Sequence, residues 1–589
     1  MKMKKLYIIL LLTVFVGCED VIEPALENNR SVNDEGIEPR FAHGLLVNGY
    51  ARIPMDSWSF NDMATDDAVA NTENNVYFGV ADGQWAANNN PLEEWQNSLT
   101  ALQYLNLMLE RLDGIEFSAL EPVDVMFQDR IRGEAHALRA LFVYHLLRSH
   151  GGRATDGALL GGPIFLESTN PTTSDFNIPR ATFEECMQQI YSDTEAALAL
   201  LPNDYENISD DSEVPDKYLE IGGSFDHYNR VFGEDARLLI TGRITRAIRA
   251  QAALLAASPA FNDPTNTTTW ADAANYAAEV IDLNGGITGL DPNGLVWYTN
   301  ANGQIASAGS GLSSPEILWR GSLGGPSSNL EETHYPPTLF GDGLLNPTQN
   351  LVDAFPMSNG YPITHPASGY DPANPYAGRD PRLSEFIIYN GSTAGPNGSV
   401  ILTTVDGGTN DGLNQAETST RTGYYMKKLL RQDVNANPNS INAQLHVQPR
   451  IRYTEIYLAY AEAANEAFGP EGTGPNQYSA YDVVKAIRMR AGIPDNDPYL
   501  ESIRNDKFAM RELIRNERRL ELCFEGFRFW DLRRWNEDLT EAARGIQIES
   551  GFYQVIEVDN RNFDSYMKYG PVPDSEMLKF SELKQNAGW

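Results

Sequence analysis

Apolar positions at helical spacing predict much of the secondary structure of this chain. After Thr182, apolar side chains recur every three or four residues until Pro202, where the pattern stops. Thr182 and Glu185 form the Thr-x-x-Glu pattern of a capping box, so we expect a helix that begins just after Thr182. Comparable patterns predict further helices over residues 132–150, 243–257 and 270–284.

The hydrophobic pattern changes twice along the chain. Residues 41–285 are mostly helical and rich in alanine, whereas residues 286–445 are rich in Gly, Pro, Asn and Ser, which favour loops and short strands. The helical pattern returns over residues 446–545, and irregular chain is expected from there to Trp589. A long segment without regular helices inside an ordered domain is usually functional. The sequence therefore predicts a mainly α fold with a loop-rich face.

The N-terminus has the pattern of an export signal. Lys2, Lys4 and Lys5 precede an apolar run over residues 6–16, which is too short to span a bilayer and typical of a signal peptide. A small residue, Gly17, then precedes Cys18, as at a lipoprotein cleavage site. We expect residues 1–17 to be removed, Cys18 to carry lipid and residues 18–40 to form a tether. The alternative is a secreted protein with a chance cysteine. No other stretch is long and apolar enough to be a membrane helix.

Composition excludes some classes of partner. The chain has 589 residues and a formal charge of -35, and removal of Lys2, Lys4 and Lys5 leaves 42 basic against 80 acidic residues. Such a surface repels phosphate backbones, which argues against nucleic acid. Besides Cys18, only Cys186 and Cys523 are present, each in an apolar helical stretch. We expect two buried thiols, although a disulfide between them stays open.

The segment from Arg515 to Trp535 combines dense charge with aromatic residues. One interpretation is a basic ligand site built from its arginines. The other is structural: the arginines pair with Glu517, Glu521 and Glu525 within and between helices, while the aromatic side chains seal the core. A helix with ordered mixed charge is more often a packing element, and Asp380, flanked by two arginines, is expected to be structural for the same reason.

Several blocks of sequence occur together in one order. They are Arg132-Gly133-Glu134-Ala135 with Leu138-Arg139-Ala140, Gly162-Pro163-Ile164, residues 179–202, Arg379-Asp380-Pro381-Arg382-Leu383, Gly423-Tyr424-Tyr425 with Lys427-Lys428, residues 452–463, Arg488-Met489-Arg490-Ala491-Gly492, residues 515–535, Tyr569-Gly570-Pro571-Val572-Pro573 and Gln585-Asn586-Ala587-Gly588-Trp589. This ordered set, over about residues 50–589, resembles the SusD/RagB family of surface nutrient-binding lipoproteins. The chain departs from the family pattern in a longer Gly-rich insertion before Gly162 and in the final block, where QNPGY is more usual.

The resemblance implies a fold, a partner and a function. It implies a scaffold of tetratricopeptide-like helical pairs and a loop-rich, short-strand ligand region, together forming one SusD-like domain over residues 41–589. It also implies a lid over a SusC-like TonB-dependent transporter in the outer membrane, to which the protein is anchored by lipid on Cys18. The ligand of most relatives is an oligosaccharide, and of some a peptide.

Aromatic and polar residues in the loop-rich parts are the ligand candidates. Trp85 and Asn88 place an aromatic ring and an amide three residues apart, and they resemble the Trp–Asn pair of starch-binding relatives, preceded by Asp66 and Asp67. Sugars present flat apolar faces that stack on aromatic rings, so the further aromatic candidates are Trp297, Tyr298 and Tyr335. The alternative for Trp85 is that it packs a loop against the scaffold. Trp319 lies in a segment expected to be a short buried strand and is not a candidate.

Catalytic motifs are missing from the sequence. It contains no His-Glu-x-x-His, no Gly-x-Ser-x-Gly, no phosphate-binding loop and no Cys/His metal spacing, so we expect no catalytic residues, no metal and no cofactor. A pair of glycosidase carboxylates stays open, because sequence gives no distance between two carboxylates. The prediction is a non-enzymatic surface lipoprotein that binds an oligosaccharide and delivers it to a SusC-like transporter. The alternatives are peptide binding by the same scaffold and a surface glycosidase.

Overall fold

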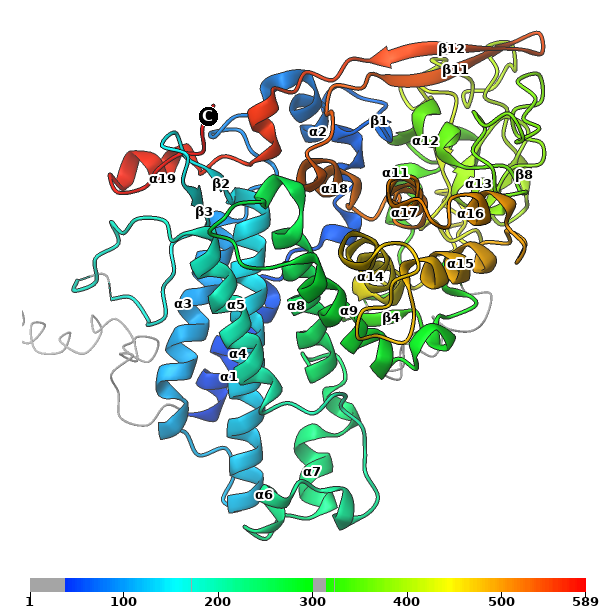
Figure 1. The fold of residues 1–589 in the computed structure, drawn as a ribbon. Coiled ribbons are helices and arrows are strands. Elements are labelled where there is room, and N and C mark those ends of the chain that lie inside the picture. The colour runs from blue at the N-terminus through cyan, green and yellow to red at the C-terminus, as the bar shows by residue number, and fades with distance from the viewer. Residues whose placement is uncertain (1–37, 171, 300–313, 323) are drawn as a thin grey trace, which may run out of the picture.

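The computed structural model describes residues 38–170, 172–299, 314–322 and 324–589. The predicted signal peptide, Cys18 and nearly all of the predicted tether lie outside these residues. The chain forms two halves that lie side by side (Figure 1). The helical half contains the long helices, and the loop-rich half contains most of residues 324–448, where the helices are short. Among the described residues, none of the helices has the combination of length and apolar sequence that a membrane span needs.

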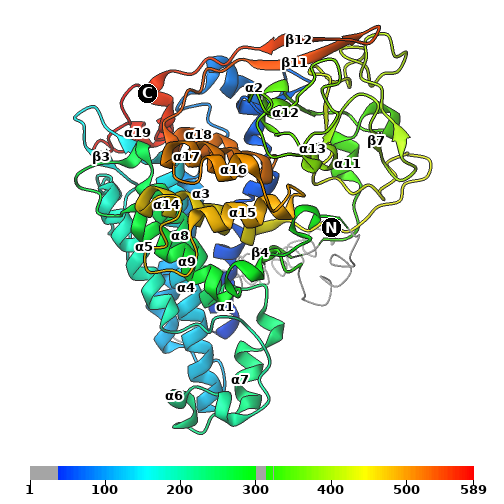
Figure 2. The same cartoon turned by 45° about the vertical axis from the view of Figure 1, so that its right-hand side comes forward.

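The helical half is an array of longer helices in which each member packs against the next member of the array. Its members, in packing order, are α1 (Pro39–Ala51), α3 (Trp95–Arg111), α4 (Glu121–His150), α5 (Phe183–Leu198), α8 (Gly242–Ala257), α9 (Trp270–Leu283), α14 (Tyr453–Phe468) and α17 (Lys507–Glu521). Figure 2 shows this stack turned by 45°. The sequential packing confirms the predicted mainly α scaffold and is consistent with tetratricopeptide-like stacking.

Local sequence signals determine where these helices begin and end. The capping box at Thr182 is present, with the Thr182 hydroxyl accepting from the N–H of Glu185, and a second box forms between Thr269 and Asp272.

Close packing of the helices depends on small residues. A Cβ on Gly133 of α4 would lie 2.6 Å from Leu201, which follows α5, so a larger residue would push the two helices apart.

The remaining helices and the strands are short. The helices are α2 (Val76–Gly79), α6 (Asp216–Leu219), α7 (Phe225–Phe232), α11 (Asn329–His334), α12 (Gln349–Ala354), α13 (Pro381–Phe386), α15 (Ala480–Arg490), α16 (Pro498–Ser502), α18 (Arg528–Trp535) and α19 (Asp574–Lys579). The antiparallel strand pairs are β1 (Ala68–Ala70) with β5 (Leu345–Pro347), β2 (Gly152–Arg153) with β3 (Leu159–Leu160), β4 (Ile317–Arg320) with β10 (Pro449–Arg452), β6 (Ile387–Ile388) with β9 (Tyr425–Met426), and β7 (Thr393–Ala394) with β8 (Ser399–Val400). In the described part of the predicted loop-rich region, residues 286–299, 314–322 and 324–445, all elements are short. Trp319 lies in the buried strand expected for it.

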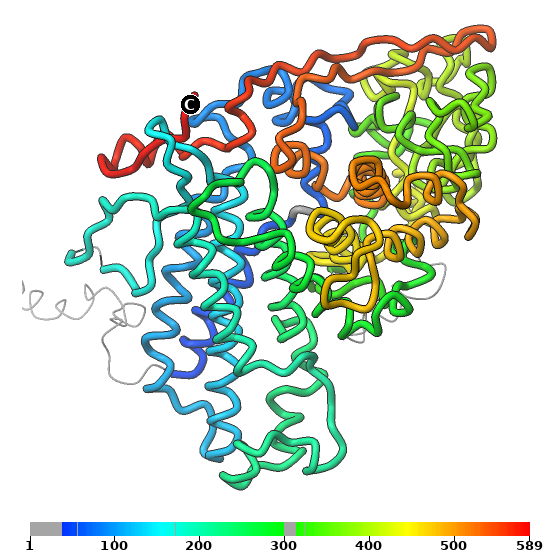
Figure 3. Tube along the Cα trace, viewed as in Figure 1, coloured from blue at the N-terminus to red at the C-terminus, as the bar shows by residue number. Residues whose placement is uncertain are grey.

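Two parts of the chain differ from the prediction. Residues 52–94 contain little helix, and Phe60, Met63 and Ala68 pack in the core of the loop-rich half, where β1 pairs with β5. The irregular C-terminal segment instead contains a hairpin of β11 (Ala543–Glu549) and β12 (Phe552–Asp559), which runs along one edge of the molecule (Figure 3).

A two-residue turn closes this hairpin. Ser550 and Gly551 both have positive φ, at 49° and 82°, as hairpin turns of this length require. Ile546 and Ile548 of β11 are buried in the loop-rich half, and the Ile546 N–H donates to the carbonyl of Thr422. Alternating apolar residues beside Ser-Gly were therefore a readable hairpin signal.

The two cysteines behave as small apolar side chains. Cys186 lies in the core of the helical half and Cys523 in the core of the loop-rich half, and both are buried free thiols. Burial raises the pKa of each thiol to about 12. The predicted buried thiols are confirmed, and the two residues form no disulfide with each other.

Candidate functional site

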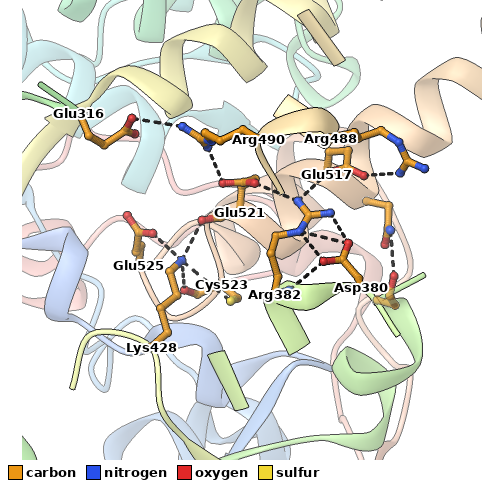
Figure 4. A network of polar contacts seen from close by, with 12 residues as sticks. Glu316, Asp380, Arg382, Lys428, Arg488, Arg490, Glu517, Glu521, Cys523 and Glu525 are labelled. Atoms are coloured by element: carbon orange, nitrogen blue, oxygen red, sulfur yellow. Dashed lines mark hydrogen bonds and ion pairs between the residues drawn. The ribbon is translucent and has the colours of Figure 1, made fainter. Parts of the chain in front are cut away.

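A continuous chain of alternating charges lies buried between the two halves. We call it the ionic network and define it by the residues Asp497, Arg488, Glu517, Arg382, Asp380, Glu521, Arg490, Glu316, Arg452, Glu525 and Lys428. Figure 4 shows most of its members with their side chains directed toward one another. Its members come from α13, α15, α17 and β10, from segments beside β4, β9 and α16, and from the link between α17 and α18, so it joins elements far apart in sequence.

Arg382 pairs with three carboxylates of the network. Its Nη1 lies 2.7 Å from Glu517 and 2.9 Å from Glu521, and its Nη2 lies 2.7 Å from Asp380. The Arg382 side chain is completely buried. A buried charge is tolerated only when it is paired and hydrogen-bonded, so each carboxylate here depends on its arginine.

The pairing outweighs the cost of burial. Burial alone would raise the pKa of Glu517, but Arg382 and Arg488 outweigh it and hold that pKa below its ordinary value. Burial would also raise the pKa of Glu525. The positive charges of Arg452 and Lys428 outweigh this effect and lower the pKa of Glu525 below its ordinary value. Glu517 and Glu525 are therefore charged at neutral pH, and both are occupied by protein partners.

The rest of the Arg515–Trp535 segment is also structural. Arg534 donates to Glu462 of α14 and to Asp531, and Trp535 Nε1 donates to Glu462 at 2.7 Å. Phe529 and Trp535 are buried. These contacts confirm the structural interpretation of this segment, including the pairing of Glu517, Glu521 and Glu525, and they confirm the structural role expected for Asp380.

Asp66 and Asp67 are buried in a second cluster of charges. Arg528 binds Asp66 through two hydrogen bonds of 3.0 and 2.9 Å, and Arg519 donates to both carboxylates at 2.7 Å. Burial opposes ionisation of Asp66, but Arg519 and Arg528 lower its pKa, whereas burial raises the pKa of Asp67. The two aspartates fasten the segment before β1 to α17 and α18. The prediction that they face a ligand is wrong for this conformation.

Trp85 is part of a buried aromatic cluster and is only 3 % exposed. Its ring centroid lies 4.8 Å from that of Trp589 and 5.7 Å from that of Phe529, and the Arg533 guanidinium lies 4.8 Å from the ring centre. Trp85 Nε1 donates to Asn90 Oδ1 at 2.9 Å. A ring covered in this way offers no free face to a sugar, so the predicted stacking platform at Trp85 is wrong for this conformation, and the packing alternative holds.

The other aromatic candidates are buried as well. Trp297 is 1 % exposed and Tyr335 is fully buried, and both belong with Tyr298 to the core of the loop-rich half. Trp297 and Tyr298 meet edge to face at 5.6 Å, and the Tyr335 hydroxyl donates to the carbonyl of Arg431. Apolar burial outweighs any surface role for these rings, so the prediction that they line an open ligand arc is wrong here.

Asn88 is the one predicted ligand residue that is exposed. It lies in a tight turn closed by two hydrogen bonds between the backbones of Ala86 and Asn89, at 3.3 and 2.9 Å. The hydrogen bond from Trp85 Nε1 to Asn90 Oδ1 joins the residues on either side of this turn. Trp85 therefore acts as a positioning residue for the turn, and Asn88 stays a ligand prediction.

A cavity that the sequence did not indicate lies between α4, α8, β10, α17 and α18. It has a volume of about 90 Å³, and its walls include Gln251, Glu455, Arg518 and Trp530. Glu455 Oε2, Arg518 Nη1 and Trp530 Nε1 have no hydrogen-bond partner within the described part of the chain. Gln251 donates to Glu455 Oε1 at 2.6 Å, and burial raises the pKa of Glu455 to about 7.

The described residues show no candidate metal-binding site. Across the described residues, no group of three or more His, Cys, Asp or Glu side chains is arranged to hold a metal ion.

Two family models match this chain. A model of the SusD family matches residues 315–589, and a model described as "Starch-binding associating with outer membrane" matches residues 41–213. The chain belongs to the SusD/RagB family. The match over residues 315–589 includes α17 with Glu517 and Glu521 of the ionic network. The match over residues 41–213 includes Asp66 and Trp85.

Solved SusD-like structures share the fold over nearly the whole chain. A SusD-like protein from Bacteroides fragilis is 24 % identical, with a TM-score of 0.70 over 94 % of this chain and 97 % of that chain. A SusD-like carbohydrate-binding protein from the same species is 20 % identical, with a TM-score of 0.67 over 92 % and 99 %. These similarities confirm the predicted SusD-like fold.

A curated relative supports the family from sequence. A SusD-like protein of Formosa agariphila is 31 % identical over 153 residues. The matched segment spans 26 % of this chain and 26 % of that relative, so the match covers about a quarter of the relative's length.

Arg382→Ala should destabilise the protein by about 3–5 kcal/mol, because it leaves Asp380, Glu517 and Glu521 buried without their shared cation. Urea unfolding measures the change. Arg504→Ala is the matched control, since the Arg504 side chain is 45 % exposed in its contacts with Glu471 and Glu501 and should change stability by less than about 1 kcal/mol. Equal effects of the two substitutions would contradict the account of the ionic network.

Trp85→Ala should destabilise the protein by about 3–5 kcal/mol, because it removes a buried ring from contact with Phe529, Arg533 and Trp589. Thermal unfolding measures the loss. Phe508→Ala, at a side chain that is 70 % exposed, is the control and should shift stability by less than about 0.5 kcal/mol. An unchanged melting temperature for Trp85→Ala would show that the ring is free.

Glu455→Gln should stabilise the protein at pH 8 by up to about 3 kcal/mol and have little effect at pH 4. The folded-state pKa of Glu455, about 7, lies above its ordinary value of 4.5, so the wild type loses stability as pH rises between these values. A neutral amide removes this loss and can keep the contact with Gln251. Urea unfolding at both pH values measures it, with the exposed Glu549→Gln as control. Identical pH profiles of wild type and Glu455→Gln would contradict the raised pKa.

Proposed function

We propose that this protein is a non-enzymatic surface lipoprotein that captures an oligosaccharide outside the cell and delivers it to a SusC-like TonB-dependent transporter. Membership of the SusD/RagB family carries the proposal. One of the solved proteins with the same fold is described as carbohydrate binding, and the model over residues 41–213 is described as starch-binding.

The proposed location follows from the N-terminal sequence. The apolar run over residues 6–16 and the Gly17-Cys18 pair support export and lipid attachment, and the family model that matches residues 41–213 is described as associating with the outer membrane. Lipid on Cys18 would hold the protein at the cell surface, where a transporter in the same membrane is within reach.

The proposed mechanism uses no bond-making chemistry. The stacked helices and the buried ionic network form a rigid frame, and the exposed turn at Asn88 presents an amide that can donate to and accept from sugar hydroxyls. A preformed site loses little conformational entropy on binding. Such a frame supports binding of an oligosaccharide and not its chemical conversion.

Calorimetry of the mature chain against panels of oligosaccharides and peptides tests this proposal. The protein should be purified in a detergent without a sugar head group. We expect at least one glycan to bind and to be recovered unchanged. Binding of peptides alone would favour a RagB-like peptide receptor, and release of shorter sugars would favour a glycosidase. Either result contradicts the proposal.

Asn88→Ala should weaken binding of that glycan about ten-fold, because it removes about one to two hydrogen bonds to the ligand. The melting temperature should not change, since the Asn88 side chain is exposed. Asn439→Ala, at an exposed asparagine in the loop-rich half, is the matched control and should leave the affinity unchanged. Unchanged affinity of Asn88→Ala would remove Asn88 from the ligand site.

A further inference from the structure

A groove with a volume of about 400 Å³ lies between α3, α19 and the segments over residues 163–170 and 172–178. We call it the α3–α19 groove. Its size is within the range of small-molecule sites. No residue of the Arg515–Trp535 segment or of the buried aromatic candidates lines it. Its aromatic side chains include Tyr104, Phe165, Phe176 and Phe580.

The walls of this groove are held in place by hydrogen bonds. Gln103 of α3 donates to the carbonyl of Thr169 at 3.0 Å and accepts from its N–H and hydroxyl at 2.8 and 2.7 Å. Asn106 donates to the carbonyl of Phe165 at 2.8 Å. On the opposite side, Asn177 donates to Ser581 and accepts from the N–H of Glu582, both at 3.0 Å. The groove is therefore formed before a ligand arrives.

One face of α3 supplies uncommitted polar groups. Gln96, Thr100 and Tyr104 are separated by one turn each, so they follow one another along the groove. Within the described residues, the side chains of Gln96 and Thr100 make no hydrogen bond to protein. An amide and a hydroxyl are thus left beside aromatic rings, as recognition of a ligand with apolar faces and hydroxyl edges requires.

The charge of the groove is balanced. Its lining includes only two ionisable carboxylate or ammonium groups, Glu576 and Lys579, and these pair with each other at 2.7 Å. The lining residues offer an anionic ligand no unpaired cation, and the Arg52 guanidinium, 5.8 Å from the centre of the Tyr104 ring, lies outside this lining. A peptide that adds to a sheet would find no strand, because the lining residues lie on helices and on an irregular segment.

The groove adjoins the turn that carries Asn88. The N–H of Asp574, the first residue of α19, donates to the carbonyl of Ala87 at 3.1 Å. The same short helix then supplies Glu576 and Lys579 to the groove. A chain of sugars in the groove could therefore continue toward Asn88.

We infer that the α3–α19 groove binds a neutral oligosaccharide by stacking on Tyr104 and Phe176 and by hydrogen bonds to Gln96 and Thr100. This inference rests on the proposed capture of a glycan and names a surface on which part of that glycan lies.

The test compares the mature wild-type chain with the double variant Tyr104→Ala/Phe176→Ala in calorimetric titrations with the glycan that the panel identifies. We expect at least a ten-fold loss of affinity. Phe508→Ala, which removes an exposed ring from α17, is the control and should bind as the wild type does. The milder Gln96→Ala, at an exposed side chain, should weaken binding about three-fold to ten-fold without changing the melting temperature.

A second measurement does not depend on the variants folding. Hydrogen–deuterium exchange of the wild type with and without saturating glycan should show protection over residues 163–178 and 574–583. Wild-type affinity of the variants, or glycan protection only elsewhere, would overturn the groove and leave the proposed capture intact. Absence of glycan binding by the wild type would overturn both, and protection of these segments by a peptide alone would overturn the ligand class.

Discussion

The buried alternation of arginines and carboxylates between the two halves is the constraint on which the rest of this structure depends. Arg382 alone holds three carboxylates, two of them on α17, and removing water from such groups is tolerable only while every partner is in place. Because α13, α15 and α17 each contribute charges, the network sets how the loop-rich half docks on the helical array. The segment with the densest charge is therefore part of the frame and leaves no cation of the network free for a ligand.

Local signals in the sequence predicted the helical half well. The capping box at Thr182, the cap at Thr269 and the strand at Trp319 depend on residues close to one another in the chain, and all three were found. Glu517 and Glu521 lie one turn apart, which indicated a structural helix, but their partner Arg382 lies more than a hundred residues away. The spacing of charged residues along the helix indicated that they form ion pairs, but it did not indicate which distant residues are their partners.

The ligand residues were harder to predict, because exposure is a property of the whole fold. Trp85 lies in a stretch of Gly and Asn that is typical of a surface loop, yet Phe529 and Trp589, more than four hundred residues away, cover its ring. Asp66 and Asp67 are likewise covered by Arg519 and Arg528. The α3–α19 groove is formed by three segments that meet only in space, and no motif marks it.

We propose that the glycan binds on the face formed by α3, α19 and the Asn88 turn, while the Arg515–Trp535 segment stays structural. A crystal structure of the mature chain with a bound oligosaccharide tests this most directly. Sugar density should lie along the groove beside Tyr104 and Phe176, with the contacts of Arg382, Arg519 and Arg528 unchanged. Sugar density on the arginines of α17 and α18, with the groove empty, would contradict it.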